Sequence, residues 1–102
     1  MTDDLRAPRV WNKRDPNAPA DAVYVGRPSK WGNPFEIGKA DPLGTGKPLD
    51  RDGAIRWYRG WITHVYPEIR EAARVELRGK HLVCWCAPAA CHANVLLEIA
   101  NG

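Results

Sequence analysis

Residues 82–96 read LVCWCAPAACHANVL, and this stretch decides the fold class. Its first part belongs to His81–Cys86, an apolar run of strand length, while Ala90–Ala100 carries apolar side chains at helical spacing. The alanines and the proline between these two segments predict a short loop. A strand that leads directly into a helix in this way is typical of α/β domains.

The rest of the chain supplies the other elements that such a domain needs. Val10–Trp11 and Ala22–Val25 are rich in β-branched and aromatic residues, and both are predicted as strands. Prolines and glycines concentrate before residue 54, so Gly26–Phe35 and Gly38–Pro48 are predicted as loops. The N-terminal half is therefore expected to contribute short strands joined by loops.

Two helices are predicted between these loops and the final strand. The first begins near Asp50 or Asp52, because either carboxylate can cap it, and Pro67 ends it and opens the second. Gly79 suits the position that follows the second helix, Glu68–Arg78. The apolar face of the first helix is expected to consist of Ala54, Tyr58, Trp61, Ile62 and Val65.

The resulting order is strand, strand, helix, helix, strand, helix. It predicts a small single-domain α/β fold over residues 1–102, with a short, partly parallel sheet and about three helices. The sheet is expected to include Ala22–Val25 and Leu82–Cys86. These two strands can lie parallel because the intervening helices provide a crossover connection.

Length, charge and hydropathy exclude several classes of protein. The 102 residues include 15 Lys and Arg against 12 Asp and Glu, and the net charge of +3 permits nucleotide or nucleic-acid binding without requiring it. No apolar run approaches the roughly 20 residues of a membrane span, and the N-terminus lacks the apolar stretch of a signal peptide. The three cysteines cannot all pair within the chain, so a reducing, cytoplasmic location is expected.

The junction Cys84–His92 concentrates chemical groups, and two interpretations of it remain open. In one, Cys84, Cys86, Cys91 and His92 form a tetrahedral Cys₃His zinc site. In the other, no metal binds, and the start of the last helix stabilises an anion and a reactive thiolate at Cys91, with His92 as acid or base. For Cys84 alone, burial in the core is the simpler explanation, because free cysteine is among the most buried residue types.

The loop Gly26–Phe35 is a second candidate binding segment. In this interpretation Arg27 and Lys30 hold a phosphate, and Trp31 stacks on a planar base. A structural loop with Trp31 turned inward is the alternative. The other candidate ligand-binding residues of this loop are Gly26, Ser29, Gly32 and Asn33.

Two long segments carry a family resemblance. Residues 23–35, VYVGRPSKWGNPF, and residues 77–88, LRGKHLVCWCAP, followed by Cys91 and His92, resemble the domain of unknown function 4326 family. The similarity spans roughly residues 8–101. Members of that family occur in bacteriophages and bacteria, and these segments are its hallmark. The resemblance therefore implies that the two segments form one site.

Taken together, these observations predict a small cytoplasmic domain that binds a phosphorylated, nucleotide-like ligand through both segments. If the protein is an enzyme, Cys91 is the expected nucleophile and His92 the expected acid or base. The alternative is a non-catalytic module, stabilised by zinc, that binds nucleic acid or, in a phage setting, a host protein. No membrane partner is expected.

Overall fold

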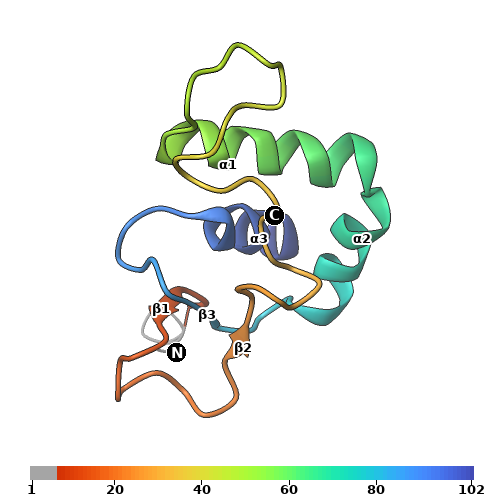
Figure 1. Ribbon diagram of the computed structural model, residues 1–102. Helices are drawn as coiled ribbons and strands as arrows, with labels where there is room; N and C mark the ends of the chain where they lie inside the picture. The colour runs from red at the N-terminus through yellow and green to blue at the C-terminus, as the bar shows by residue number, and fades with distance from the viewer. Residues whose placement is uncertain (1–6) are drawn as a thin grey trace.

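The computed structural model describes residues 7–102, and Figure 1 shows the order of their elements. Two short strands precede a long loop, two helical segments follow, and a third strand leads into the last helix. The elements are β1 (Val10–Asn12), β2 (Val23–Tyr24), α1 (Arg51–Gly60), the π-helix η2 (Trp61–Val65), α2 (Pro67–Glu76), β3 (Leu82–Cys84) and α3 (His92–Asn101).

The three strands form one parallel sheet in the order β1-β3-β2. Leu82 of the central strand β3 pairs with Val10 on one side and with Val23 on the other. All residues of β3 are buried, as expected for a central parallel strand. The predicted α/β fold is confirmed, including a short parallel sheet and, within residues 7–102, three α-helices.

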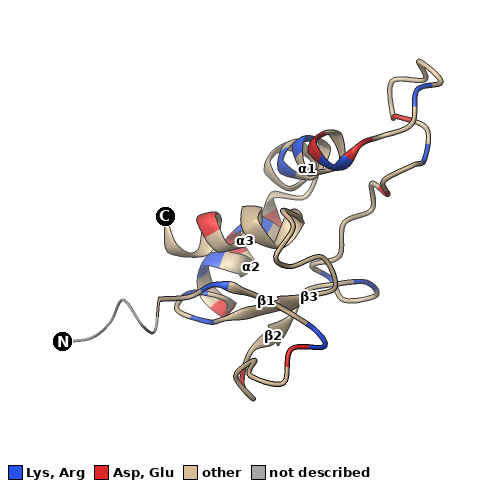
Figure 2. Cartoon of the chain, turned by 90° about the vertical axis from the view of Figure 1, so that its left-hand side faces the viewer, with Lys and Arg blue, Asp and Glu red and all other residues tan. Residues whose placement is uncertain are grey.

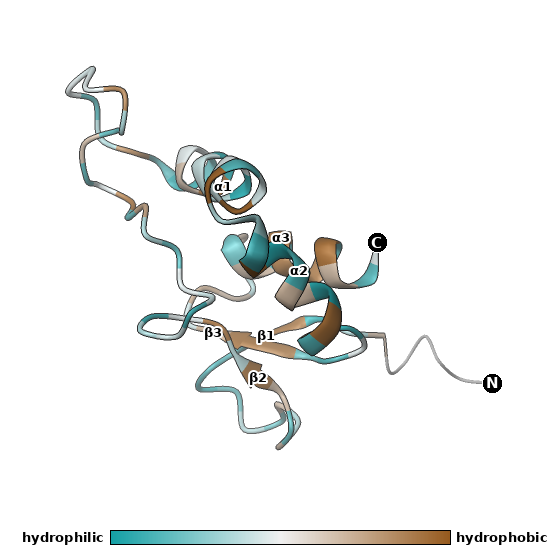
Figure 3. Cartoon of the chain, turned by 90° about the vertical axis from the view of Figure 1, so that its right-hand side faces the viewer, coloured by the Kyte–Doolittle hydropathy of each residue, from teal (hydrophilic) through white to brown (hydrophobic). Residues whose placement is uncertain are grey.

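The helices lie on one side of the sheet, as Figure 2 shows. Helix α3 packs against β1 and β3, and α1 and α2 pack against α3. Figure 3 shows that apolar residues follow the strands of the sheet. The fully buried core residues with the largest side chains are Tyr58, Ile62, Leu77, Leu82, Leu96, Val25, Val95 and Cys84.

The predicted starts of the first two helices agree with the structure, whereas α2 ends at Glu76 rather than Arg78 and α3 begins at His92 rather than Ala90. Asp50 is the N-cap of α1, and its Oδ1 accepts a hydrogen bond of 2.7 Å from the backbone N–H of Gly53. Pro67 is the first residue of α2. Gly79 has φ +74°, a left-handed conformation that glycine adopts without strain.

The predicted apolar face of the first helix is wrong at its C-terminal end. The last turn is the π-helix η2, in which the backbone N–H of Tyr66 donates to the carbonyl of Trp61 over 2.9 Å. This wider turn changes the angular spacing of the side chains that follow it. Val65 is consequently 60% exposed, whereas Ile62 is fully buried.

The loop that contains residues 38–48 extends away from the sheet and helices (Figure 2). Its two ends are held together by an antiparallel bridge between Ala40 and Pro48. Leu43, between these two residues, is 74% exposed. Among the described residues, no helix combines the length and apolar character needed to cross a membrane.

Candidate functional site

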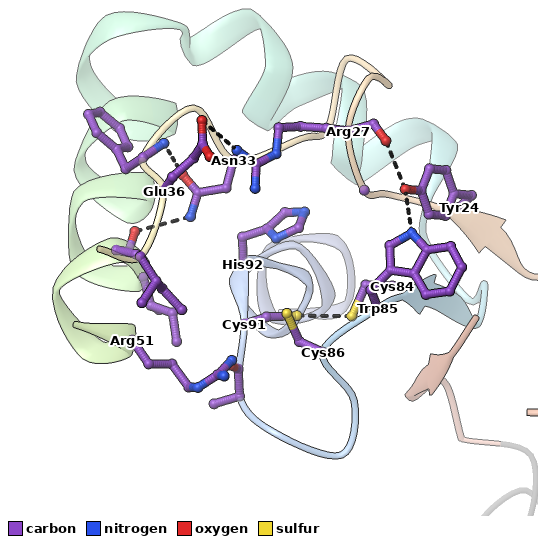
Figure 4. Close-up of a pocket in the computed structure, with 16 residues that line it drawn as sticks. Tyr24, Arg27, Asn33, Glu36, Arg51, Cys84, Trp85, Cys86, Cys91 and His92 are labelled. Carbon is purple, nitrogen blue, oxygen red and sulfur yellow. Dashed lines mark hydrogen bonds and ion pairs between the residues drawn. The ribbon is translucent and has the colours of Figure 1, made fainter. Parts of the chain in front are cut away.

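A cavity of about 330 Å³ lies where the chain leaves β2 and β3, next to the first turn of α3 (Figure 4). In parallel α/β sheets, ligands commonly bind beyond the carboxyl ends of the strands, as this cavity is placed. The two segments singled out in the sequence therefore meet in space. The residues on its wall include Gly26, Arg27 and Asn33, then Arg51 of α1, and then Cys84, Trp85, Cys86, Cys91 and His92.

Two buried thiols lie side by side on the cavity wall. The Sγ atoms of Cys84 and Cys91 are 3.1 Å apart (Figure 4). The backbone N–H groups of Cys86 and Ala87 also donate to the sulfur of Cys84. The adjacent Cys91 thiol, as a donor, lowers the pKa of Cys84 to about 6, with the two backbone donors adding to this effect.

The hydrogen bond between the two thiols raises the pKa of Cys91. Because Cys91 donates to Cys84 and is itself buried, its pKa is raised. Cys91 is the N-cap residue of α3, and its backbone N–H donates to Oδ1 of Asn94 over 2.9 Å. The contact between the two thiols thus lowers the pKa of Cys84 and raises that of Cys91, and the expected burial of Cys84 in the core is confirmed.

His92 is fixed by the strand opposite it. Its Nε2 lies 2.7 Å from the carbonyl oxygen of Val25, and its ring packs edge-on against Tyr58 with 5.1 Å between the ring centroids. Burial lowers the pKa of His92, and the nearby charge of Arg27 lowers it further. The neutral ring must carry its proton on Nε2 to donate to this carbonyl, which leaves Nδ1 as an acceptor.

Two arginines lie on the wall of the cavity. Arg27 forms an ion pair of 3.2 Å with Glu36, and both side chains are about half exposed. Arg51 donates from Nη1 to the carbonyl oxygen of Ala90 over 2.9 Å. These two guanidinium groups come from different parts of the chain and lie on the same cavity (Figure 4).

Trp85 provides an exposed aromatic ring on the cavity wall. The residue is 54% exposed, and its Nε1 donates to the hydroxyl oxygen of Tyr24 over 3.1 Å. That hydroxyl in turn donates to the carbonyl oxygen of Arg27 over 2.8 Å. The guanidinium of Arg14 lies over the indole, 5.5 Å from the ring centroid.

Trp31, at the centre of the predicted binding loop, lies in the hydrophobic core and not on the cavity. Trp31 is only 4% exposed and belongs to the hydrophobic core, so its predicted role as a stacking surface is wrong. Its carbonyl oxygen accepts a hydrogen bond of 2.8 Å from the Tyr58 hydroxyl. Burial raises the pKa of Tyr58, which keeps this donor protonated. The alternative interpretation, a structural loop with Trp31 turned inward, holds for this residue.

Two other residues of this loop direct their side chains to partners within the protein. Nζ of Lys30 lies 2.8 Å from both carboxylate oxygens of Glu76, near the end of α2. The hydroxyl of Ser29 donates to the carbonyl oxygen of Gly26 over 2.6 Å. Neither side chain lines the cavity, and the predicted phosphate contact of Lys30 is corrected accordingly.

Gly32 and Asn33 shape the loop. A Cβ atom at Gly32 would lie 2.8 Å from Cγ of Arg27, so glycine permits this close approach. Asn33 lines the cavity, but its side chain donates to the carbonyl oxygen of Ala54 over 3.2 Å and accepts from the backbone N–H of Phe35 over 2.8 Å. Both residues therefore fix the conformation of the loop that forms this part of the cavity wall, Gly32 by its close backbone approach and Asn33 by its hydrogen bonds.

Comparison with known proteins identifies the family. The family model described as Domain of unknown function (DUF4326) matches residues 9–102. The chain belongs to the DUF4326 family. No curated protein and no solved structure matches it. The resemblance noted in residues 23–35 and 77–88 is thereby confirmed at the level of the family.

The described residues show no preformed cluster of the four ligands that the zinc interpretation expects. Within residues 7–102, no group of three or more His, Cys, Asp or Glu side chains is arranged to hold a metal ion. Cys84 and Cys91 contact each other, while His92 directs Nε2 to the carbonyl of Val25. The set Cys84, Cys86, Cys91 and His92 therefore lines one cavity without forming a four-ligand cluster.

Sequence reasoning missed several residues of the DUF4326 cavity as site residues, among them Arg51 and Trp85. Arg51 lies among several arginines of two helices and has no distinguishing pattern in the sequence. Trp85 stands between two cysteines, Cys84 and Cys86, in an apolar run. Strand alternation would have directed this ring away from the cysteines, but β3 ends at Cys84, and the bend that follows brings Trp85 to the same cavity.

Proposed function

We propose that this DUF4326 domain binds a phosphorylated, nucleotide-like ligand in the cavity between β2, β3 and α3. The observation that carries the proposal is the joint presence, on one cavity, of the guanidinium groups of Arg27 and Arg51 and the exposed ring of Trp85. Its volume of about 330 Å³ is at the lower end of the range for small-molecule sites.

The anionic part of the ligand would lie near the two arginines. Guanidinium groups form paired, charge-assisted hydrogen bonds with phosphate oxygens. The first turn of α3 adds the positive end of the helix dipole beside His92. Because Arg27 is paired with Glu36, the phosphate must compete with that exposed carboxylate. The ion pair is half exposed, so this competition costs little.

The planar part of the ligand would stack on Trp85. The indole is held in place through Tyr24, which leaves little rotational freedom to lose on binding. The guanidinium of Arg14 over the ring adds positive charge next to the indole. Base-to-indole stacking contributes about 1–3 kcal/mol. Trp85 thus takes the role that sequence reasoning gave to Trp31.

Isothermal titration calorimetry with matched ligand pairs tests this proposal. A panel of the common ribonucleosides, with their mono- and diphosphates, separates phosphate recognition from base stacking. We expect binding of at least one nucleotide, and affinity for its nucleoside weaker by roughly tenfold or more. Equal affinity for nucleoside and nucleotide, or no binding across the panel, would contradict the proposal.

Charge variants sharpen the same experiment. Arg27→Gln and Arg51→Gln should each weaken nucleotide binding by roughly 10- to 100-fold, since each removes a charge-assisted hydrogen bond. Arg74→Gln is the matched control, because Arg74 lies in the last turn of α2 and outside the cavity. An equal loss of affinity in the control would attribute binding to net charge alone.

The proposal also concerns location and the alternative function. The three cysteines are free in the structure, and a reducing cytoplasm would preserve them as thiols for any cysteine chemistry on the ligand. A zinc-stabilised module that binds nucleic acid or a host protein has less support, since the described residues form no metal-binding group. The nucleotide-binding proposal is therefore the better supported of the two.

A further inference from the structure

We propose that Cys84 and Cys91 form a reactive dithiol that exchanges with small disulfides entering the cavity. The proposal is independent of the nucleotide, because it rests on the two sulfurs and the chain around them. Both residues line the cavity, although each is buried, with 1% and 5% exposure. A reagent therefore reaches the sulfurs through the cavity and not across the outer surface of the domain.

The separation of the sulfurs is suited to a bond between them. They lie 3.1 Å apart, and a disulfide needs about 2.05 Å. The two residues belong to different elements, the end of β3 and the N-cap of α3, joined by a loop of six residues from 85 to 90. A movement of about 1 Å shared by these segments would bring the sulfurs together.

Cys84 is the attacking thiol in this scheme. Its sulfur accepts hydrogen bonds from the backbone N–H groups of Cys86 and Ala87, and the thiol of Cys91 donates to it as well. Such donors stabilise a thiolate, which is the nucleophilic form of cysteine. Cys91 also has a backbone donor, the N–H of Ala93, but because its own thiol donates to Cys84 it keeps its proton and is placed to resolve the intermediate.

The exchange balances without a metal or a cofactor. The Cys84 thiolate attacks one sulfur of a disulfide R–S–S–R, which forms a Cys84–S–S–R bond and releases RS⁻. Cys91 then loses its proton to solvent or to the released thiolate and attacks the sulfur of Cys84, which breaks the Cys84–S–R bond and releases the second RS⁻, protonated by solvent. The products are the Cys84–Cys91 disulfide and two molecules of thiol, so the small disulfide is reduced as the protein is oxidised.

Cys86 is the competing thiol and gives the proposal a sharp internal control. It lines the same cavity and is more exposed than the other two cysteines. If exposure alone governed reactivity, Cys86 would form the mixed disulfide. The proposal requires instead that the pair with the short sulfur contact reacts, and that Cys86 remains a free thiol.

The first experiment treats the folded wild-type protein with oxidised glutathione and follows free thiols and intact mass. We expect the number of free thiols to fall from three to one, with a mass loss of two hydrogens and no lasting glutathione adduct. Dithiothreitol should restore all three. Three unreacted thiols, or a stable adduct on Cys86, would overturn the proposal.

Peptide mapping then assigns the bond. Residues 81–102 contain no Lys or Arg, so trypsin leaves all three cysteines in one peptide, and chymotryptic cleavage after Trp85 separates Cys84 from Cys86 and Cys91. Because residues 86–96 keep those two cysteines together, the remaining free thiol is alkylated first, and fragmentation of this peptide shows whether Cys86 or Cys91 carries the label. The Cys86→Ser variant should still lose two thiols. A Cys84–Cys86 bond in the wild type, or loss of exchange in Cys86→Ser, would refute the assigned pair.

Single variants separate attack from resolution. Cys91→Ala should accumulate a stable glutathione adduct on Cys84, and Cys84→Ala should form no adduct on Cys91. If Cys84→Ala does not fold, wild-type mapping still tests the pair. As a reference, protein oxidised in denaturant should give several pairings, because unfolding removes the contact that selects one. The same mixture of pairings from the folded protein would show that the fold does not select the Cys84–Cys91 pair.

Discussion

The loop Gly26–Phe35 and the junction Cys84–His92 both carry polar and reactive residues, but the structure uses them differently. In the loop, Lys30 pairs with Glu76, and Trp31 is buried against the core. In the junction, the three cysteines, the indole and the imidazole all lie on the cavity. The loop thus places Arg27 on the cavity while its centre supports the fold, and the junction supplies the sulfurs, the imidazole and the indole.

The difference has a structural cause. Residues of a loop can turn their side chains back to their own backbone, as Ser29 and Asn33 do, and such bonds satisfy the loop without a ligand. The junction instead runs from a buried strand into the start of a helix, where side chains and free N–H groups converge. Residue type alone does not separate these two situations.

The largest expected effect tests this division with two tryptophans. Trp31→Ala should lower the free energy of unfolding by about 3–5 kcal/mol, because it leaves a cavity in the core. Trp85→Ala should cost at most about 1 kcal/mol, because the ring is half exposed. Urea denaturation followed by circular dichroism measures both variants under the same conditions.

Nucleotide binding should reverse this order. Trp85→Ala should weaken binding by roughly tenfold through loss of stacking, while the milder Trp31→Phe should leave the affinity nearly unchanged. If Trp31→Phe kept full stability and lost binding, the centre of the loop around Trp31, and not Arg27 alone, would be part of the binding site. The comparison between the two segments would then have to be abandoned.

A second, intermediate effect concerns His92. This residue belongs to the junction, and its hydrogen bond to the carbonyl oxygen of Val25 connects the junction to the segment that follows β2. Burial lowers the pKa of His92 in the folded protein, so the unfolded chain binds this proton more readily. The contribution of His92 to stability is complete above its unfolded pKa of about 6.5 and is lost as the pH falls from there toward the lowered folded value.

Thermal or urea unfolding between pH 8 and pH 5 checks this sign. His92→Gln should cost about 0.5–3 kcal/mol at pH 8, and the difference from wild type should shrink as the pH falls. His64→Gln, in the exposed part of η2, is the control and should leave the wild-type pH profile unaltered. A difference that grows toward pH 5 would mean that folded His92 is stabilised as a cation.

Most of the secondary structure could be predicted from the sequence. Periodicity located the strands and helices, and Asp50 and Pro67 located two helix ends, because capping depends on local chemistry. The π-helical turn after Gly60 was missed, since no residue in it departs from an α-helical pattern. Its consequence, an exposed Val65, depends on how the chain turns toward α2.

The candidate site was predictable to a similar extent. Cys91 and His92 were found because they stand together before a helical pattern, and the structure places both on the cavity. Arg51 could not be found, since only the packing of α1 near the loop after β3 brings it to Ala90. The thiolate preference of Cys84 likewise depends on backbone donors that no side-chain pattern reveals.

The smallest expected effect concerns Lys30, the cation of the loop that the structure directs away from the cavity. Its ammonium group lies 2.8 Å from Glu76 and 4.7 Å from the ring centroid of Trp31, and its side chain is 51% exposed. Lys30→Ala should therefore cost about 0–1 kcal/mol of stability, as exposed ion pairs usually do. A double-mutant cycle with Glu76→Ala measures their coupling.

Calorimetry decides what Lys30 does for the ligand. Nucleotide affinity of Lys30→Ala should stay within about twofold of wild type, in contrast to Arg27→Gln, because the ammonium group does not line the cavity. If the two variants lost affinity equally, Lys30 would have to leave Glu76 and turn into the site on binding. The loop would then be a moving ligand clamp, and its ion pair with α2 would be the contact that holds it open.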